Sequence, residues 1–221
     1  MKKILCSIVI ICGLQQFVNA QEFRFGLTAS PEFCWFAIHG DDIQSDGPRI
    51  GFQYGLLFEP TIGSVERYAF STGVIVNVAG GTISDPDSIP SFERFSNIKA
   101  QYIEIPLTIK LRTNEVNYMT YYGLFGITPA VNIQARDHIE DGDGNVIEED
   151  LDIRDQNGTE NYKLFNMSLT LGAGVEYAMT ENTAITGGIF FQNGFTNVFE
   201  TAATEENIQL KQFGIRLGVL F

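Results

Sequence analysis

Alternation of apolar and polar residues with a period of two recurs along the chain after residue 20, and this feature limits the fold most. In one run, Ile103, Ile105, Leu107, Ile109 and Leu111 share one face, and Tyr102, Glu104, Pro106, Thr108 and Lys110 share the other. No window after residue 20 shows a long helical period. Because successive side chains of a strand point to opposite faces, the pattern predicts strands with one apolar face.

Eight such strands are expected and no convincing helix, at about 22–37, 48–59, 67–79, 98–112, 118–135, 162–178, 183–195 and 207–221. The connections between them alternate between long and short, so one rim of an up-and-down barrel would be elaborate and the other plain. That asymmetry is typical of outer-membrane barrels. The predicted fold is therefore all-β, an eight-stranded antiparallel up-and-down transmembrane β-barrel. Pro106 and Pro129 fall within strands, and each is expected to mark a bulge or a strand edge.

The sequence alone does not decide which face of the barrel points inward. A water-soluble barrel would turn its apolar face inward and carry a charged outer face. The polar faces here are rich in Gly, Ser, Thr, Asn and Gln and poor in charge, which is more typical of a packed polar interior. Strand length also suits a tilted membrane crossing of about 9–11 residues.

A few isolated charges stand on the polar faces, namely Glu104, Lys110, Glu176 and Arg216. Glu104 and Lys110 lie on one strand about 20 Å apart, so each needs a partner from another strand. Glu104, Lys110 and Arg216 are candidates for the lining of a conduction path. The alternative is a structural network, because eight strands leave an interior only just filled by side chains.

The N-terminus differs from the rest of the chain. Lys2 and Lys3 precede an apolar run from Ile4 to Leu14, and small residues before Gln21 fit a cleavage site. Residues 1–20 are predicted to be a secretory signal peptide, and residues 21–221 the barrel domain. Ile11 before Cys12 argues against a lipoprotein anchor. Cleavage would leave Cys34 without an internal disulfide partner, so its expected role is plain packing.

The net charge of −13 argues against a nucleic-acid partner. The segment 137–155 holds nine of the 27 acidic residues, as expected of a solvated loop. Within it, Asp141, Asp143 and Asn145 are spaced to offer oxygen ligands to calcium. An EF-hand, however, needs glycine where the chain has Val146. The alternative is a plain acidic hairpin; no other cofactor is expected.

Catalysis is not expected. The only histidines are His39 and His138, both placed in long loops. The stretch from His39 to Asp42 is the nearest approach to an acid–base cluster, but no partnered serine accompanies it. Because geometry defines such sites, the sequence predicts a non-enzymatic protein and leaves a loop-based hydrolase as a remote alternative.

Three segments resemble those of a known family. "YIEIPLTIKLR" (102–112), "GAGVEY" (172–177) and "FQNGFTNV" (191–198) are similar in order and spacing to segments of the PorT-like eight-stranded outer-membrane barrels of Bacteroidota. The resemblance implies an outer-membrane location. It also suggests a role in an envelope assembly, because the founding member is needed for type IX protein secretion. Location transfers between relatives better than task does.

The resulting hypothesis is a structural or interaction component of an outer-membrane assembly, with a narrow porin-like channel for ions or small solutes as the alternative. Long loops would be extracellular and the termini periplasmic. The expected partners are outer-membrane lipid, the barrel assembly machinery and other envelope proteins. Outer-membrane barrels resemble one another in ending on an aromatic residue that the assembly machinery reads, so Phe221 is expected to be the insertion signal.

Overall fold

A computed structural model describes residues 23–39, 44–63, 67–85, 94–141, 146–153, 162–199 and 207–221. The predicted signal peptide, 1–20, lies outside them. The strands are β1 (Phe23–His39), β2 (Gln44–Ser45), β3 (Arg49–Pro60), β4 (Tyr68–Asp85), β5 (Arg94–Glu104), β6 (Leu107–Arg112), β7 (Met119–Asp141), β8 (Val146–Asp152), β9 (Phe165–Ala178), β10 (Ala184–Gly194) and β11 (Asn207–Leu220). No helix in these ranges is long and apolar enough to cross a membrane.

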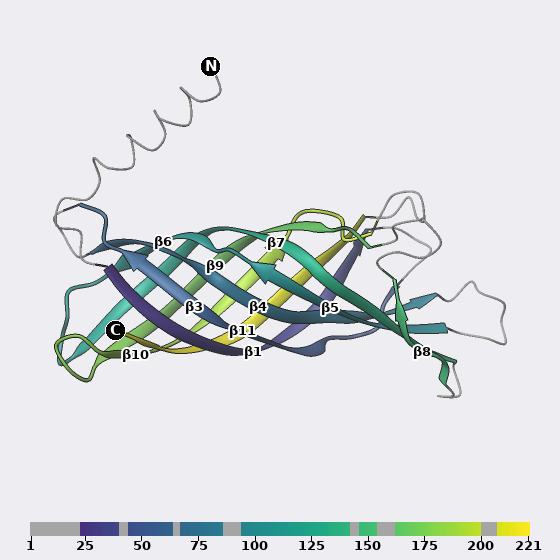
Figure 1. The fold of residues 1–221 in the computed structure, drawn as a ribbon, viewed down its shortest axis with the longest axis horizontal. Helices are drawn as coiled ribbons and strands as arrows, with labels where there is room; N and C mark the ends of the chain where they lie inside the picture. Colours follow the sequence, from purple (N-terminus) through teal and green to yellow (C-terminus); the bar gives the residue numbers. More distant parts are fainter. Residues whose placement is uncertain are drawn as a thin grey trace, which may run out of the picture.

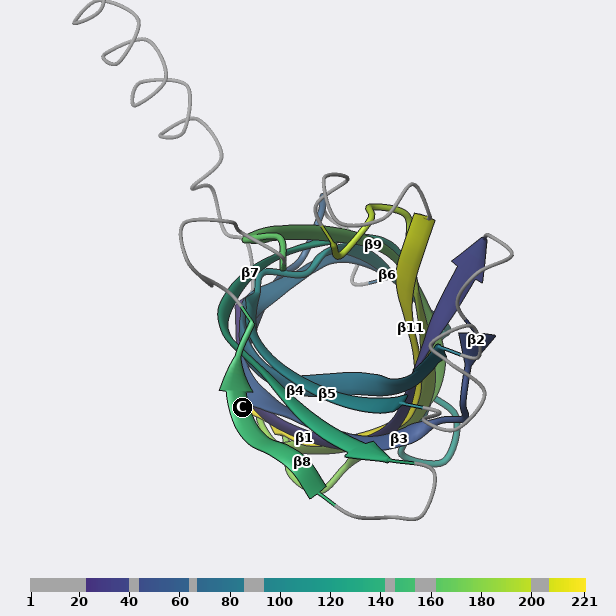
Figure 2. The ribbon, with the colours of Figure 1, turned by 90° about the vertical axis from the view of Figure 1, so that its right-hand side faces the viewer.

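The strands form one antiparallel sheet that closes on itself, as the end-on view in Figure 2 shows. The ring runs β1, β3, β4, β5 with β6, β7, β9, β10 and β11. Closure is made by β1 and β11, which pair from Gly26 opposite Leu220 to His39 opposite Asn207. The predicted eight-stranded barrel is therefore confirmed, with β5 and β6 acting as one strand of the ring.

Proline explains the division between β5 and β6. Both pair with β4 in a single register, with Glu104 opposite Ile75 and Thr108 opposite Ser71. Pro106 sits between them, without the N–H that would continue the ladder. Pro129 lies inside β7 opposite the same interruption and accepts a 3.0 Å hydrogen bond from the Ile105 amide. Pro129 therefore marks neither a bulge nor a strand end, and the register shift of this pair lies between Gln101 and Tyr102.

The two ends of the barrel differ, as predicted, although the strand boundaries shift. β4 and β5 extend past the predicted ends, so their connection shrinks to 86–93. β8 pairs with the end of β7 and continues this side of the wall beyond the ring. In Figure 1 β8 lies at one end of the barrel, and the C-terminus lies at the other with the short turns. We call them the long-loop end and the short-turn end.

Burial decides which face points inward. On β1, Phe25, Leu27 and Phe33 are exposed, whereas the alternating residues Thr28, Ser30 and Glu32 are buried. The same holds for residues 102–111. The alternate residues from Ile103 to Leu111 point outward, and those from Tyr102 to Lys110 point inward. A water-soluble barrel would show the opposite arrangement. The apolar face is the outer one, which suits contact with lipid.

Candidate functional site

The four charged residues singled out from the sequence all lie in the barrel interior. Glu104, Lys110, Glu176 and Arg216 come from β5, β6, β9 and β11, and each is at most 6% exposed. Strand alternation places them there because each stands two residues from other buried positions on its strand. The structure brings two of the four into direct contact, Lys110 and Glu176.

Lys110 is the centre of an ion-pair network near the short-turn end. Its ammonium donates to both carboxylate oxygens of Glu59, at 2.8 and 2.9 Å, and contacts Glu176. Arg24 bridges the same two carboxylates, at 2.8 Å from Glu176 and 3.1 Å from Glu59. Arg112 adds a 2.8 Å bond to Glu59. This interior network is defined by Arg24, Glu59, Lys110, Arg112 and Glu176.

Mutual pairing is what lets these charges stay buried. An unpaired ion in a low-dielectric interior costs several kcal/mol, whereas hydrogen-bonded partners offset most of that penalty. Ser71 donates a further hydrogen bond to Glu59 at 3.0 Å. The Lys110 ammonium also lies 4.4 Å from the centre of the Tyr122 ring, within reach of a cation–π contact. The network therefore links several strands across the interior and fills the interior at this level.

Glu104 and Arg216 belong to a separate central layer. Glu104 accepts hydrogen bonds from Asn77 at 2.6 Å and Gln192 at 3.2 Å, and Gln192 accepts one from Gln53 at 3.0 Å. The Arg216 guanidinium lies 5.2 Å from the centre of the Phe190 ring. Two side-chain amides therefore hold the Glu104 carboxylate, and the Arg216 guanidinium lies beside an aromatic ring.

Inward glycines make room for the aromatic rings of the interior. A methyl group on Gly188 would lie 2.8 Å from the Tyr122 hydroxyl, and one on Gly214 would lie 2.7 Å from the Phe190 ring. A methyl group on Gly81 would likewise lie 2.7 Å from the Phe36 ring. Rings can therefore lie flat across the wall where glycine removes the side chain, and the narrow interior is filled rather than hollow.

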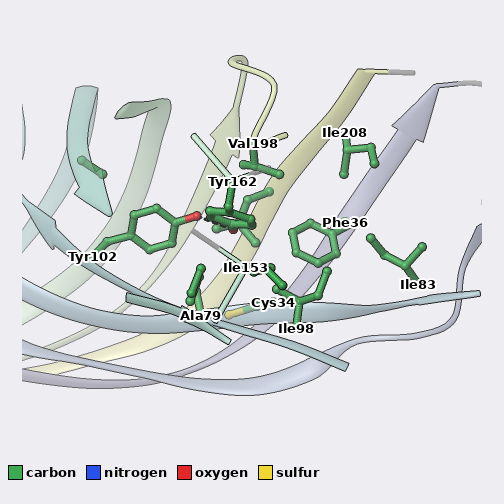
Figure 3. Close-up of a cluster of buried hydrophobic side chains, with 14 residues drawn as sticks. Cys34, Phe36, Ala79, Ile83, Ile98, Tyr102, Ile153, Tyr162, Val198 and Ile208 are labelled. Atoms are coloured by element: carbon green, nitrogen blue, oxygen red, sulfur yellow. Dashed lines mark hydrogen bonds between the residues drawn. The ribbon is translucent and has the colours of Figure 1, made fainter. Parts of the chain in front are cut away.

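An apolar cluster fills the interior towards the long-loop end, as Figure 3 shows. The Tyr102 and Tyr162 hydroxyls meet at 2.5 Å, and Phe199 packs edge-on against Tyr162 at 5.1 Å. Phe36 and Ile153 complete the packing. These two residues and the two tyrosines, which Figure 3 labels, are all buried. Cys34 is buried in this cluster as a free thiol, and its sulfur donates to Glu32 at 3.2 Å.

A cavity of about 1120 Å³ opens at the short-turn end. Arg24, Arg112 and Glu176 of the interior network close its inner side. Its wall is completed by polar residues of the short turns, including Thr113, Asn114, Thr180, Glu181, Asn182 and Thr183. The ion pairs therefore separate this vestibule from the rest of the interior.

The predicted calcium loop is only partly described. Asp141 ends β7, whereas Asp143 and Asn145 lie outside the described residues. The flanking strands do form a hairpin, with Glu140 opposite Val146. Within the described ranges, no group of three or more His, Cys, Asp or Glu residues could hold a metal ion. Calcium binding by this loop stays a prediction.

The structure describes only part of the segment from His39 to Asp42, and it places His138 in a strand rather than in the predicted loop. His39 ends β1, and Asp41 and Asp42 lie outside the described residues. His138 lies on β7, with its Nε2 atom 3.2 Å from Glu140. This contact is a neighbouring pair on one exposed strand, and it brings in no third group.

Glu59, Arg24 and Arg112 were missed as members of the interior network. Each stands on the inward face near the short-turn end of its strand, and Arg112 follows Lys110 at the spacing that returns to the same face. That spacing is a usable signal. The strand register, which brings Glu59 across β4 to Lys110, is not visible in one sequence.

Phe221 continues the pairing of the last strand. Its amide donates to Phe25 at 2.7 Å and its carbonyl accepts from Phe25 at 3.1 Å, while its ring is exposed on the outer face. The backbone at this position is therefore held by β1. Recognition of Phe221 as an insertion signal stays a prediction.

Comparisons with known proteins give a matching family and structural neighbours. Residues 19–200 match the family model described as outer membrane protein beta-barrel domain. Neisserial surface protein A (NspA) has a similar structure, with a TM-score of 0.52 and 14% identity over 91% of this chain and 98% of that one. The outer membrane protein OprG from Pseudomonas aeruginosa has a TM-score of 0.46 and 12% identity, over 91% and 97% of the two chains. Comparison with curated protein sequences gave no match.

Three observations indicate an outer-membrane location. They are the closed antiparallel ring, the outward apolar face and the family match over most of the chain. Only a closed barrel lets strands cross lipid with every backbone group paired. The protein is therefore located in the outer membrane, and the chain belongs to the outer-membrane protein β-barrel family.

Proposed function

We propose that this protein is a non-enzymatic, non-conducting barrel that acts as a structural or interaction component of an outer-membrane assembly. The observation that carries the proposal is the filled interior. The interior network lies across one level of the barrel, and the cluster around Tyr102 and Tyr162 fills another. With the interior occupied, the surfaces left for function are the two ends and the lipid-facing wall.

The filled interior also weighs against the narrow pore. A conduction path needs continuous water, but the charged residues of the interior network are paired with each other. Lys110 and Glu59 are each about 3% exposed or less. An interior made by eight strands is only just wide enough for side chains, so opening it would require breaking several ion pairs at once.

The long-loop end offers a surface for a partner. β8 extends the wall beyond the ring and lies within the acidic segment 137–155. By the general arrangement of such barrels, this end faces the cell exterior and the termini face the periplasm. The resemblance to PorT-like barrels supports a secretion-related assembly among the possible ones. Export by the segment 1–20 and insertion by the barrel assembly machinery through Phe221 belong to the same proposal.

Crosslinking in native membranes tests the assembly role. The full chain would be tagged in its own cells, crosslinked gently and purified, and compared with a variant carrying Asp150→Asn and Asp152→Asn in β8. The control carries Glu115→Gln and Glu181→Gln, two exposed changes at the short-turn end. We expect one discrete adduct that the β8 variant loses and the control keeps. A barrel recovered alone would contradict the proposal.

A further inference from the structure

An apolar groove of about 460 Å³ lies on the outer surface of the barrel. Phe33, Trp35 and Phe213, from β1 and β11, form its floor. Ser45, Gly47 and Pro48, from the β1–β3 connection, form its wall. β2 pairs with β4, and Gly47 and Pro48 follow it next to the end of β1, so the connection forms one side of a groove on the outward face of β1 and β11.

The groove is continuous with the lipid-facing surface. Phe33 and Phe213 stand opposite each other in the pairing of β1 with β11, and both are about half exposed. The Trp35 ring reaches across β11, with its centre 6.3 Å from that of Phe191 on β10. Since the barrel is in the outer membrane, the groove opens onto hydrocarbon rather than water, and an acyl chain suits its lining.

A cation stands at the end of the groove that is nearer the long-loop end. Lys211 is the direct cross-strand partner of Trp35 and lies two residues before Phe213, on the same outward face. The distance from Lys211 to Phe221 along the tilted strand corresponds to a height of about 25 Å, the height of the apolar band of such barrels. Lys211 therefore lies at the boundary of the band, at the level of lipid headgroups.

We propose that this groove binds one acyl chain of a lipid with an anionic phosphate headgroup, in the leaflet at the long-loop end, with Lys211 contacting the phosphate. The apolar floor and the boundary lysine match the two parts of such a lipid. A lysine near the surface favours anionic over zwitterionic headgroups. The loop wall distinguishes this site from the open lipid-facing strands elsewhere.

Trp35 is the only tryptophan of the chain, so its fluorescence reports on the groove directly. The full barrel would be reconstituted in phosphatidylcholine vesicles that contain either brominated phosphatidylglycerol or brominated phosphatidylcholine at equal mole fraction. Bromine quenches tryptophan only at short range. We expect an apparent affinity about fivefold higher for the anionic lipid in the unaltered protein. Lys211→Gln should remove this preference, and Lys99→Gln, at an exposed lysine on β5, should retain it.

Each outcome is decisive. Equal quenching by the two brominated lipids would mean that the groove takes any acyl chain, and would overturn the phosphate contact. Absence of quenching by either lipid would mean that protein, such as a second copy of this chain, covers the groove, and would overturn the lipid site. A preference that survives Lys211→Gln would reject the role of this lysine. If Lys211→Gln fails to fold, the comparison of lipids in the unaltered protein still decides the proposal.

Discussion

The ammonium of Lys110 on β6 lies 2.8 Å from Oε1 of Glu59 on β3, although β4 separates the two strands in the sheet. The contact therefore crosses the interior and does not run along the wall. It ties together strands that share no backbone hydrogen bonds. Arg24 joins it from β1, and Arg112 adds a second contact to Glu59 from β6. The interior network thus holds the cross-section of the barrel in shape.

Glu59→Gln should destabilise the barrel strongly. The change leaves Lys110, Arg24 and Arg112 with Glu176 as the remaining carboxylate of the network. Removing one partner of a buried ion pair costs about 3–5 kcal/mol. Urea unfolding of the barrel in lipid vesicles, followed by the electrophoretic shift between folded and heated protein, measures the change. Glu115→Gln, in an exposed turn, is the control, and equal stability of the two variants would contradict the role given to the network.

Adjacent glycines of β10 should respond differently to alanine. A methyl group on Gly188 would lie 2.8 Å from the Tyr122 hydroxyl and 2.5 Å from the Ala173 carbonyl oxygen. A methyl group on Gly187, which points outward, would meet its nearest atom at 4.0 Å. We expect Gly188→Ala to cost about 1–3 kcal/mol in the same unfolding assay, as overpacking does, and Gly187→Ala to be nearly neutral. A similar loss in the free energy of unfolding for both variants would show that the interior around Tyr122 rearranges to accept the methyl group.

A charge on the outer face should be costly only where lipid meets the barrel. Leu217 is 52% exposed and lies in the middle of the outward apolar row of β11. Leu217→Arg is expected to lower the free energy of unfolding in vesicles by about 2–4 kcal/mol, because arginine near the bilayer midplane loses its hydration. Asn182→Arg, in the exposed β9–β10 turn, serves as the control. A neutral Leu217→Arg would argue that water, not lipid, covers this face.

Phe221 can be tested for a role in insertion that is separate from packing. Its ring and that of Phe213 are both exposed on the outer face of the same chain segment. If the assembly machinery reads the last aromatic, Phe221→Ala should lower the amount of folded barrel in cells several-fold, while Phe213→Ala should not. Refolding of both purified variants into vesicles is the control, because the machinery is absent there. Equal cellular yields would reject the signal.

The sequence predicted the strands and their faces because period-two alternation survives in every strand of the ring. It did not decide which face is inward, because Phe25 or Ile105 could line a soluble core as well as contact lipid. Burial in the closed ring decided that question.

The candidate site was predictable only in part. Lys110 and Glu176 were recognisable as isolated charges among small polar residues, but their contact depends on strand register. The pairing of Tyr102 with Tyr162 was not foreseen either, since the two residues lie 60 positions apart and Tyr162 stands before β9. Such long-range contacts leave no periodic trace in a single sequence.

Planar-bilayer recording on the purified, folded barrel tests the central claim most directly, with a general porin in the same chamber as the positive control. The filled interior, with Lys110 bonded to Glu59 and Tyr102 to Tyr162, predicts no discrete conductance steps at any applied voltage at which the bilayer itself stays intact. Reproducible single-channel steps from the unaltered protein would contradict the account and favour the narrow pore as the function.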